Sequence, residues 1–201
     1  MFIALAIVLF LFIVAFVAFF IFLRKMSFET FEKLCEKKVK RIAKRDKVLV
    51  IEQLHLLNYK SEKLGVHHVI FGKKYIYLIT DFLLKGFVSG EVNDNSWVYF
   101  NSVTKKNHYL SNLNKISEQN IQEFAGILGI KSDPIVSICL IPNECDFNIK
   151  NINSNQKMVV RYSSLSKKIK EFEKQSIGSL NEEQIYEQFR TIESKNNEEG
   201  R

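Results

Sequence analysis

The chain has few of the residues that mark fibrous, linker-rich or disulfide-bonded proteins. Its 201 residues include only 2 prolines, 8 glycines and 3 cysteines. So little proline and glycine excludes a collagen-like chain and one dominated by linkers. Cys35, Cys139 and Cys145 form no Cys-x-x-Cys pair, which excludes a disulfide scaffold, a zinc ribbon and a thioredoxin-type site. Length and composition indicate one globular domain with accessory segments.

Residues 2–23 carry no polar side chain, and seven of them are phenylalanine. A helix of these 22 residues reaches about 33 Å, enough to cross a hydrocarbon core of about 30 Å. No basic residue precedes the apolar run, which leads directly into Arg24 and Lys25 without a small-residue cleavage site. The pattern therefore favours a retained transmembrane helix over a cleaved signal peptide.

The charge that follows the apolar run predicts its orientation. Residues 24–47 contain ten Lys and Arg against four acids, beginning with the membrane-proximal pair Arg24 and Lys25. The positive-inside rule places such a segment in the cytoplasm. We therefore expect a single-pass protein of the cell membrane, with its N-terminus outside and the bulk of the chain cytoplasmic. Its basic juxtamembrane segment, residues 24–46, is expected to meet anionic lipid headgroups of the bilayer.

The rest of the chain has alternating helical and strand-like patterns. Amphipathic spacing predicts helices at 27–45, 108–129, 165–172 and 179–193. Segments rich in β-branched and aromatic residues predict strands at 47–57, 66–71, 75–84, 97–103, 135–141 and 158–162. Gly129 is expected to end the second helix, and Ser179 to cap the last one. This order predicts an α/β fold with a central mixed sheet flanked by helices on both faces.

Three motifs in this part occur together in one known family. Cys35-Glu36 lies on the first helix, where the family has Gly-Glu. The segments V-H-H-V-I-F-G at 66–72 and I-Y-L-I-T-D-F-L at 76–83 align with the family's I-D-H-I-V-I and I-Y-V-I-E-T-K-N strands, and Trp97 follows as its tryptophan does. On these motifs, about residues 31–173 resemble the nuclease-related domain (NERD), a branch of the restriction-endonuclease-like PD-(D/E)XK superfamily.

The resemblance implies a restriction-endonuclease-like sheet and a particular division of the chain. We expect a transmembrane helix at 2–23 and the basic juxtamembrane helix at 24–46, which begins the domain. The nuclease-related α/β domain is expected over 27–175 and an acidic helix and tail over 176–201. From Glu171 onward there are eight acids against four bases.

The family's chemistry uses carboxylates that hold a divalent metal ion and a lysine that activates water. By the alignment, the first strand carboxylate is replaced by His67, the second by Thr80 and the lysine by Phe82, while Glu36 keeps its type. One carboxylate cannot build an Mg²⁺ site, so the resemblance implies a degenerate catalytic site with no metal and no cofactor. Asp81 is the candidate for a relocated ligand, with Mg²⁺ or Mn²⁺ as cofactor only in that case.

Strand alternation restricts what these residues can do together. Asp81 should point to the opposite face from Thr80 and Phe82. By the same rule His67 and His68 should face opposite sides of their strand, so they are not expected to bind one ion together. His68 is expected to be structural.

Three functions remain open. The favoured one is a catalytically inactive, membrane-anchored module that binds nucleic acid or protein. Residues 50–170 hold fifteen bases against ten acids. The candidate phosphate contacts are Lys73, Lys74, Lys105, Lys106, Lys167 and Lys168. The alternatives are a metal-dependent nuclease using Glu36 with Asp81, and a membrane scaffold that docks an unknown protein through the helix 179–193.

Overall fold

The computed structural model describes residues 12–14, 16, 28–58, 61–149, 156–175 and 178–200. Within these residues, none of the helices combines the length and the apolar character that crossing a bilayer requires. The predicted span 2–23 lies outside the described residues except for positions 12–14 and 16, and Arg24 and Lys25 lie outside them too. The first named element, α2, begins at Phe28.

A mixed five-stranded sheet forms the centre of the fold, with its strands in the order β1-β2-β3-β7-β9. The strands are β1 (Leu49–Ile51), β2 (His68–Phe71), β3 (Ile76–Asp81), β7 (Ile135–Ile141) and β9 (Lys157–Arg161). β2 is antiparallel to both of its neighbours, whereas β3, β7 and β9 are parallel to one another. The predicted α/β class with a mixed central sheet is confirmed.

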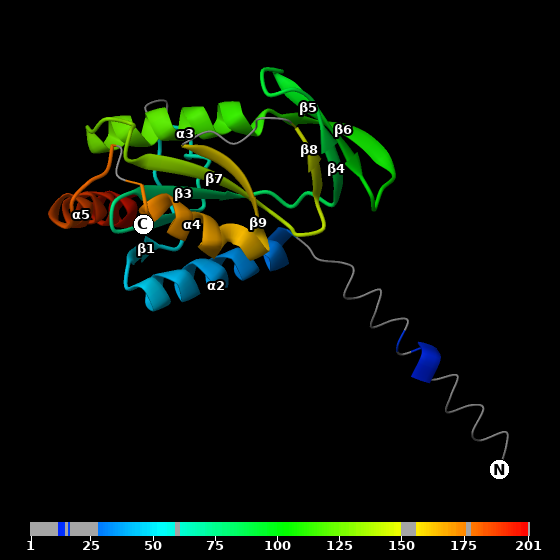
Figure 1. The fold of residues 1–201 in the computed structure, drawn as a ribbon, viewed down its shortest axis with the longest axis horizontal. Helices are drawn as coiled ribbons and strands as arrows, with labels where there is room; N and C mark the ends of the chain where they lie inside the picture. The colour runs from blue at the N-terminus through cyan, green and yellow to red at the C-terminus, as the bar shows by residue number, and fades with distance from the viewer. Residues whose placement is uncertain are drawn as a thin grey trace, which may run out of the picture.

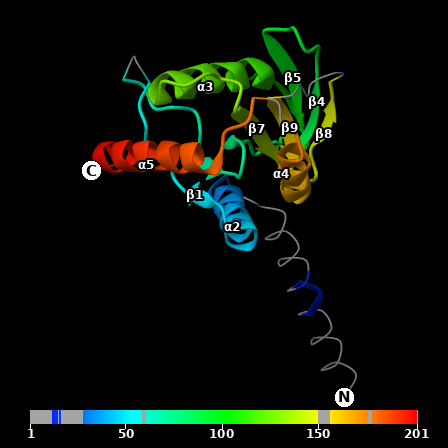
Figure 2. The ribbon, with the colours of Figure 1, turned by 60° about the vertical axis from the view of Figure 1, so that its left-hand side comes forward.

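Helices cover both faces of this sheet. The helices are α2 (Phe28–Asp46), α3 (Leu113–Leu128), α4 (Leu165–Glu173, preceded by the 3-10 turn η1, Tyr162–Ser164) and α5 (Glu182–Glu199). α2 and α4 pack on one face, and α3 and α5 pack on the other (Figures 1 and 2). Every residue of β3 and β7 is buried, as expected for strands covered on both sides.

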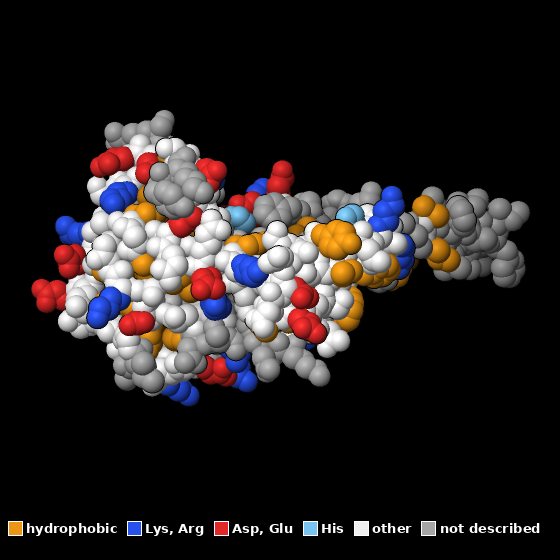
Figure 3. Space-filling view, turned by 90° about the horizontal axis from the view of Figure 1, so that it is seen from above, with side chains coloured by type: hydrophobic (Ala, Val, Ile, Leu, Met, Phe, Trp, Pro, Cys, Tyr) orange, Lys and Arg blue, Asp and Glu red, His pale blue; other side chains and the backbone are white. Residues whose placement is uncertain are grey.

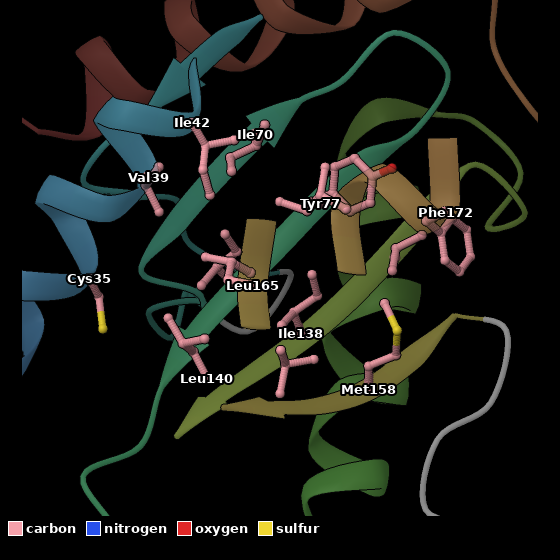
Figure 4. Packing of buried hydrophobic residues seen from close by; sticks show 14 of the residues in the cluster. Cys35, Val39, Ile42, Ile70, Tyr77, Ile138, Leu140, Met158, Leu165 and Phe172 are labelled. Atoms are coloured by element: carbon pink, nitrogen blue, oxygen red, sulfur yellow. The ribbon is translucent and has the colours of Figure 1, made fainter. Parts of the chain in front are cut away.

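The core on the α2 face confirms the predicted helical stripe. Cys35, Val39 and Ile42 of α2 point toward the sheet and toward Leu165 of α4 (Figure 4). These side chains recur every three or four residues, so they lie on one face of the helix. The basic and acidic residues between them remain at the surface of α2.

A second, four-stranded sheet was not predicted. It consists of β4 (Gly86–Ser89), β5 (Ser96–Asn101), β6 (Lys106–Ser111) and β8 (Asp146–Asn148), in the order β6-β5-β4-β8. Its inner face packs on the main sheet through the fully buried Trp97, whose Nε1 donates to the Glu91 carbonyl at 2.8 Å. The helix predicted from residue 108 is therefore wrong in its first part, where β6 stands. Asn112 separates the two elements, because its side-chain oxygen accepts the backbone N–H of Asn114 and caps α3.

Two further boundaries differ from the sequence predictions. Of the predicted strand 47–57, only the part that forms β1 is a strand. Further along, the backbone N–H groups of His55 and Leu57 donate instead to the side chains of Asn196 and Glu199 in α5, each at 2.6 Å. The last helix is capped by Asn181 rather than by Ser179, through a capping box with Gln184. The predicted stop at Gly129 is confirmed: its φ of 66° is the left-handed conformation that ends α3.

Gly72 allows a close contact between the β2–β3 turn and α4. A Cβ atom built there would lie 2.1 Å from Oε1 of Glu173, 2.8 Å from Cε2 of Tyr77 and 3.0 Å from the carbonyl oxygen of Tyr75. The same Glu173 oxygen accepts the Tyr77 hydroxyl at 2.9 Å. The absence of a side chain at position 72 therefore lets the turn close over this carboxylate.

We predict that Gly72→Ala destabilises the fold by about 1–3 kcal/mol, because the added methyl group must displace both Glu173 and Tyr77. The matched control is Gly126→Ala on the exposed side of α3, where an added Cβ meets nothing within 4 Å. That substitution should stabilise the protein by about 0.5–1 kcal/mol. Urea denaturation of the full chain in mild detergent measures both, and equal effects from the two variants would contradict the predicted contact.

Candidate functional site

Asp81 is a buried carboxylate at the end of β3. Its side chain is fully buried. Because side chains alternate along β3, Asp81 shares a face with Tyr77 and Ile79, which pack in the core beneath α2. Thr80 points to the α3 side, where its hydroxyl donates to the Gly65 carbonyl at 2.7 Å and accepts from Asn120 at 3.4 Å.

Both neighbouring histidines reach the Asp81 carboxylate. Nε2 of His68 lies 2.9 Å from Oδ2 of Asp81, and Nδ1 of His67 lies 3.4 Å from the same oxygen. His67 Nδ1 also accepts the backbone N–H of Asp81 at 3.1 Å. The expectation that the two rings diverge is wrong, because β2 begins only at His68 and His67 precedes the regular alternation.

The geometry favours an ion pair between His68 and Asp81. The second ring nitrogen of His68, Nδ1, contacts the Glu52 carbonyl oxygen, so both nitrogens face acceptors. Burial by itself lowers the pKa of His68, but Asp81 and the Glu52 carbonyl outweigh it, and the pKa lies above its usual value. Burial likewise raises the pKa of Asp81, but the two histidines hold it below the usual range.

Two α2 residues complete the surroundings of this pair. Cys35 is fully buried, and burial followed by the charge of Asp81 raises the pKa of its thiol far above the usual range, which leaves it unreactive. Glu36 lies close enough to feel the charge of His68, although the hydrogen bond from Lys40 is the main reason that its pKa is lowered. Lys40 Nζ bridges Glu36 at 2.8 Å and Glu52 at 2.6 Å.

The structure thus brings His67 and Asp81 together on the face of the sheet that α2, the helix of Glu36, covers, and it places the other aligned positions elsewhere. Thr80 faces α3, and Phe82 packs with the small-sheet core around Leu84 and Leu113. The β3 residue that faces the helix of Glu36 is therefore Asp81, one position beyond the residue that the alignment assigns to the second carboxylate. Alternation had already indicated that Asp81 and Thr80 point in opposite directions.

These residues do not fit the magnesium ion of the family's chemistry. A hard divalent cation takes several oxygen ligands, whereas Asp81 is surrounded by two imidazole rings and a thiol. Glu36 is already neutralised by Lys40. Within the described ranges, no three His, Cys, Asp or Glu side chains are grouped as a metal ion would require. Among the described residues, the buried Oδ1 of Asp81 is one of five buried side-chain atoms without a hydrogen-bond partner.

A basic cavity lies at the other end of α2. It has a volume of about 520 Å³ and is formed by the C-terminal end of α2, the β2–β3 turn and the C-terminal end of α4. Its apolar floor comes from Ile42, Val48, Ile70 and Ile169. Its charged lining consists of Arg45, Asp46, Lys47, Lys73, Lys170, Glu173 and Lys174.

Most of the positive charge at this cavity is uncompensated. Arg45 is paired with Asp46 through two contacts of 2.8 and 2.5 Å, which mainly explains the lowered pKa of Asp46. None of the four lysine ammonium groups of the lining makes a hydrogen bond or ion pair with the residues that the structure describes. Burial raises the pKa of Glu173, which favours its uncharged form relative to an exposed glutamate. These four ammonium groups, without partners among the described residues, surround one hollow with positive charge, which favours the binding of an anion there.

The lysine pairs predicted from the sequence do not form one surface. Lys73 lines the basic cavity, but Lys74 donates to the Gln175 carbonyl at 2.9 Å. Lys167 and Lys168 lie 3.9 and 2.8 Å from Glu171 on the same helix turn. Lys105 and Lys106 stand on the small sheet, at its β5–β6 turn. Stacking on bases would require exposed aromatic rings beside these lysines, and Tyr75, Trp97 and Tyr99 are all buried.

The cavity residues that sequence reasoning missed come from separate segments. Arg45 lies in the last turn of α2 and Lys47 follows the helix, while Lys170 lies in the last turn of α4 and Lys174 is its C-cap residue. The sequence shows that each of these residues is charged, but no pattern of neighbouring residues indicates that they surround one cavity. Comparison with models of known protein families, with curated proteins and with solved structures gave no match.

We predict that Asp81→Asn destabilises the protein in a pH-dependent way. The contribution of Asp81 is present above its unfolded pKa of about 3.9 and is lost as the pH falls through its lowered folded value. The contribution of His68 is fully present below its unfolded pKa of about 6.5 and is lost as the pH rises through its raised folded value. The loss should therefore be largest near pH 5.5, at about 3–5 kcal/mol, and smaller near pH 9.

Urea denaturation at both pH values measures this difference. The matched control is Asp133→Asn, which changes an exposed carboxylate away from Asp81 and its two histidines. This variant should show no such pH dependence. A loss for Asp81→Asn that stays constant over this range would show that Asp81 and His68 do not form an ion pair.

Proposed function

We propose that this chain is a membrane-anchored member of the nuclease-related domain family that binds nucleic acid without cleaving it. The observation that carries the proposal is the basic cavity, where four lysines that have no partner among the described residues surround an apolar floor. A nucleic-acid backbone offers a row of phosphate charges, and lysine and arginine contacts to phosphate supply most of its non-specific affinity. Among the described residues, no aromatic side chain lines the cavity, so we expect phosphate contacts to dominate.

The family assignment is supported by the architecture of the main sheet. The resemblance implies a central mixed sheet flanked by helices, and here β2 and β3 are antiparallel, β3 and β7 are parallel, and the helix that carries Glu36 covers one face. His67 and Asp81 meet beneath that first helix, where the resemblance places the catalytic centre. The family's carboxylate pair and lysine are missing from this point, which supports an inactive domain.

One observation favours the alternative of a nuclease with relocated ligands. Asp81 faces the helix of Glu36, and its Oδ1 atom is buried without a hydrogen-bond partner. A buried carboxylate oxygen that lacks a partner is costly unless something binds it. Against this, His68 already neutralises the Asp81 carboxylate and Lys40 neutralises Glu36.

The scaffold alternative loses its simplest docking surface. The apolar stripe of the helix predicted at 179–193 is used inside the domain, since Ile185 and Ile192 of α5 pack on the main sheet. A partner protein would therefore have to bind the exposed acidic face of α5.

The proposal also includes a membrane anchor at the N-terminal end of the domain. The apolar run 2–23 and the basic residues after it support a single-pass protein of the cell membrane with a cytoplasmic domain. The basic cavity lies at the end of α2 that is remote from this run, separated from Phe28 by a helix of 19 residues, or about 28 Å. A polyanion could thus bind there without meeting the anionic bilayer surface.

We predict that the full chain in mild detergent binds DNA or RNA without sequence preference and does not cleave either with Mg²⁺ or Mn²⁺. The affinity should fall steeply with salt, because each phosphate contact releases a counterion. The double variant Lys73→Gln, Lys170→Gln should weaken binding and reduce the salt slope by about one for each lysine. Fluorescence anisotropy over a salt series measures both quantities.

The matched control is Lys167→Gln, Lys168→Gln, which removes the same charge from lysines that contact Glu171 outside the cavity lining. It should leave the salt slope nearly unchanged. Equal effects of the two double variants would argue against the cavity, and absence of binding would favour the scaffold. Metal-dependent cleavage that disappears in both Glu36→Gln and Asp81→Asn would establish the nuclease.

We also predict that a protease added outside intact cells leaves residues 24–201 whole, because the positive-inside rule holds the basic segment in the cytoplasm. Immunoblotting of a C-terminal tag, before and after permeabilisation, measures the protection. Digestion without permeabilisation would reverse the predicted orientation.

A further inference from the structure

The small sheet has an exposed apolar face, here called the outer face and defined by Phe87, Val98, Phe100 and Tyr109. These side chains form two directly opposed cross-strand pairs, Phe87 with Phe100 and Val98 with Tyr109. Directly opposed side chains in antiparallel strands lie about 5 Å apart, so the four form one continuous patch. Tyr109 is 87% exposed, and Val103 in the adjoining β5–β6 turn is 66% exposed.

Such a patch is unusual on a sheet whose other face is buried. On the inner face, Val88, Trp97 and Tyr99 are buried against the main sheet. A sheet with one buried face normally presents polar residues to water on the other. Hydrophobic side chains gather instead over this part of the surface (Figure 3). A contiguous exposed apolar patch with a polar rim marks a surface that is covered in the working protein.

The charges around the outer face favour an anionic cover. Strands β4, β5 and β6 contain no aspartate or glutamate, and the one acid of the fourth strand, Asp146, which stands opposite Phe87, lies 3.4 Å from Arg161. Lys105 stands in the turn that borders the patch, whereas Lys106 has the opposite alternation to Tyr109 and lies on the other face of β6. Exposed aromatic and aliphatic side chains next to a lysine are the composition of surfaces that lie in the headgroup region of an anionic bilayer.

The small sheet lies at the end of the domain where α2 begins. Asp146 of β8 lies 3.4 Å from Arg161, and the next residue, Tyr162, packs on Phe31 and donates to the Leu34 carbonyl of α2. Figure 1 shows the same arrangement, with the small sheet beside the start of α2 and α5 at the opposite end. The sheet and the start of α2 therefore share one end of the molecule.

The covalent chain limits how far this end can be from the membrane. The apolar run ends at Leu23 and α2 begins at Phe28, and five residue steps span at most about 18 Å. We propose that the outer face of the small sheet rests on the anionic lipid surface of the bilayer in which the chain is anchored. This inference depends on the anchor of the proposed function but not on nucleic-acid binding.

The lipid contact orients the domain as well as covering the patch. With the outer face on the bilayer, the basic cavity and α5 point away from it, because they lie at the far end of α2. The six acids of α5 are then kept away from the anionic lipid surface.

A single fluorescent label tests this contact in the full chain reconstituted into vesicles that contain anionic lipid. Tyr109→Cys offers an exposed thiol, whereas Cys35, Cys139 and Cys145 are fully buried, and burial raises the pKa of Cys139 to about 12 and that of Cys145 to about 11. An environment-sensitive dye should therefore react at position 109 alone. We expect blue-shifted emission, quenching by lipids that carry a spin label, and protection from iodide in the water.

The matched control is Tyr186→Cys on α5, an exposed tyrosine at the opposite end of the molecule. Its label should be accessible to iodide and insensitive to spin-labelled lipid. As a second variant, Phe87→Ser with Phe100→Ser removes one cross-strand pair, and a label at Val103→Cys should then lose its quenching by lipid. Circular dichroism confirms that this variant is folded.

Each remaining outcome would overturn the inference. A label at position 109 that resembles the control shows a water-exposed face. Protection from iodide that grows with protein density, without quenching by lipid, shows that a second copy of the chain covers the patch. Alkaline extraction tests the anchor separately: a chain that is extracted lacks the anchor, whereas a retained chain with a water-exposed label contradicts only the lipid contact.

Discussion

The direction of the side chains of β3 decides what the candidate site contains. β3 pairs with β2 on one side and with β7 on the other, and all its residues are buried. A shift of one residue would exchange every side chain between the two faces, which the packing of Tyr77 and Ile79 beneath α2 prevents. This pairing directs Asp81 toward α2 and Thr80 toward α3. The local chemistry follows from it.

The chain neutralises its buried and clustered acids with its own cations. His68 contacts Asp81, and Lys40 bridges Glu36 and Glu52. In a metal-dependent nuclease a divalent ion supplies this neutralisation and also polarises the scissile phosphate. An imidazolium and an ammonium group satisfy the electrostatic requirement of the fold without that chemistry. The arrangement therefore balances these charges with groups that belong to the chain itself.

The two ends of the molecule differ in charge and in exposure. At the start of α2, the small sheet exposes apolar side chains beside Lys105. At the end of α2, the basic cavity combines, from three segments of the chain, lysines that have no partner among the described residues. A rigid helix of 19 residues holds these two surfaces apart. Under the two proposals made above, one of these surfaces faces the bilayer and the other remains free for a ligand.

The reliability of the sequence predictions followed the burial of each element. β7 was predicted with its observed bounds, because Ile135–Ile141 is apolar throughout and buried on both faces. The helical stripe of α2 was also correct. Strand β6 was missed because Lys106–Ser111 is largely exposed and carries little apolar periodicity. The strand predicted at 47–57 ended early because α5, 141 residues further along the chain, takes the backbone N–H of His55.

The amino-acid sequence by itself determined the apolar N-terminal run, the basic segment after it, the core stripes of α2 and β7, and the direction of Asp81 relative to Thr80. These properties depend on neighbours within a few residues, so periodicity and charge reveal them. Only the tertiary structure decided that the face of Asp81 is the face of α2, that both histidines reach one carboxylate, and that Lys47, Lys73 and Lys170 surround one cavity. Those contacts join segments far apart in the chain, and strand pairing and helix packing bring them together in ways that no local pattern encodes.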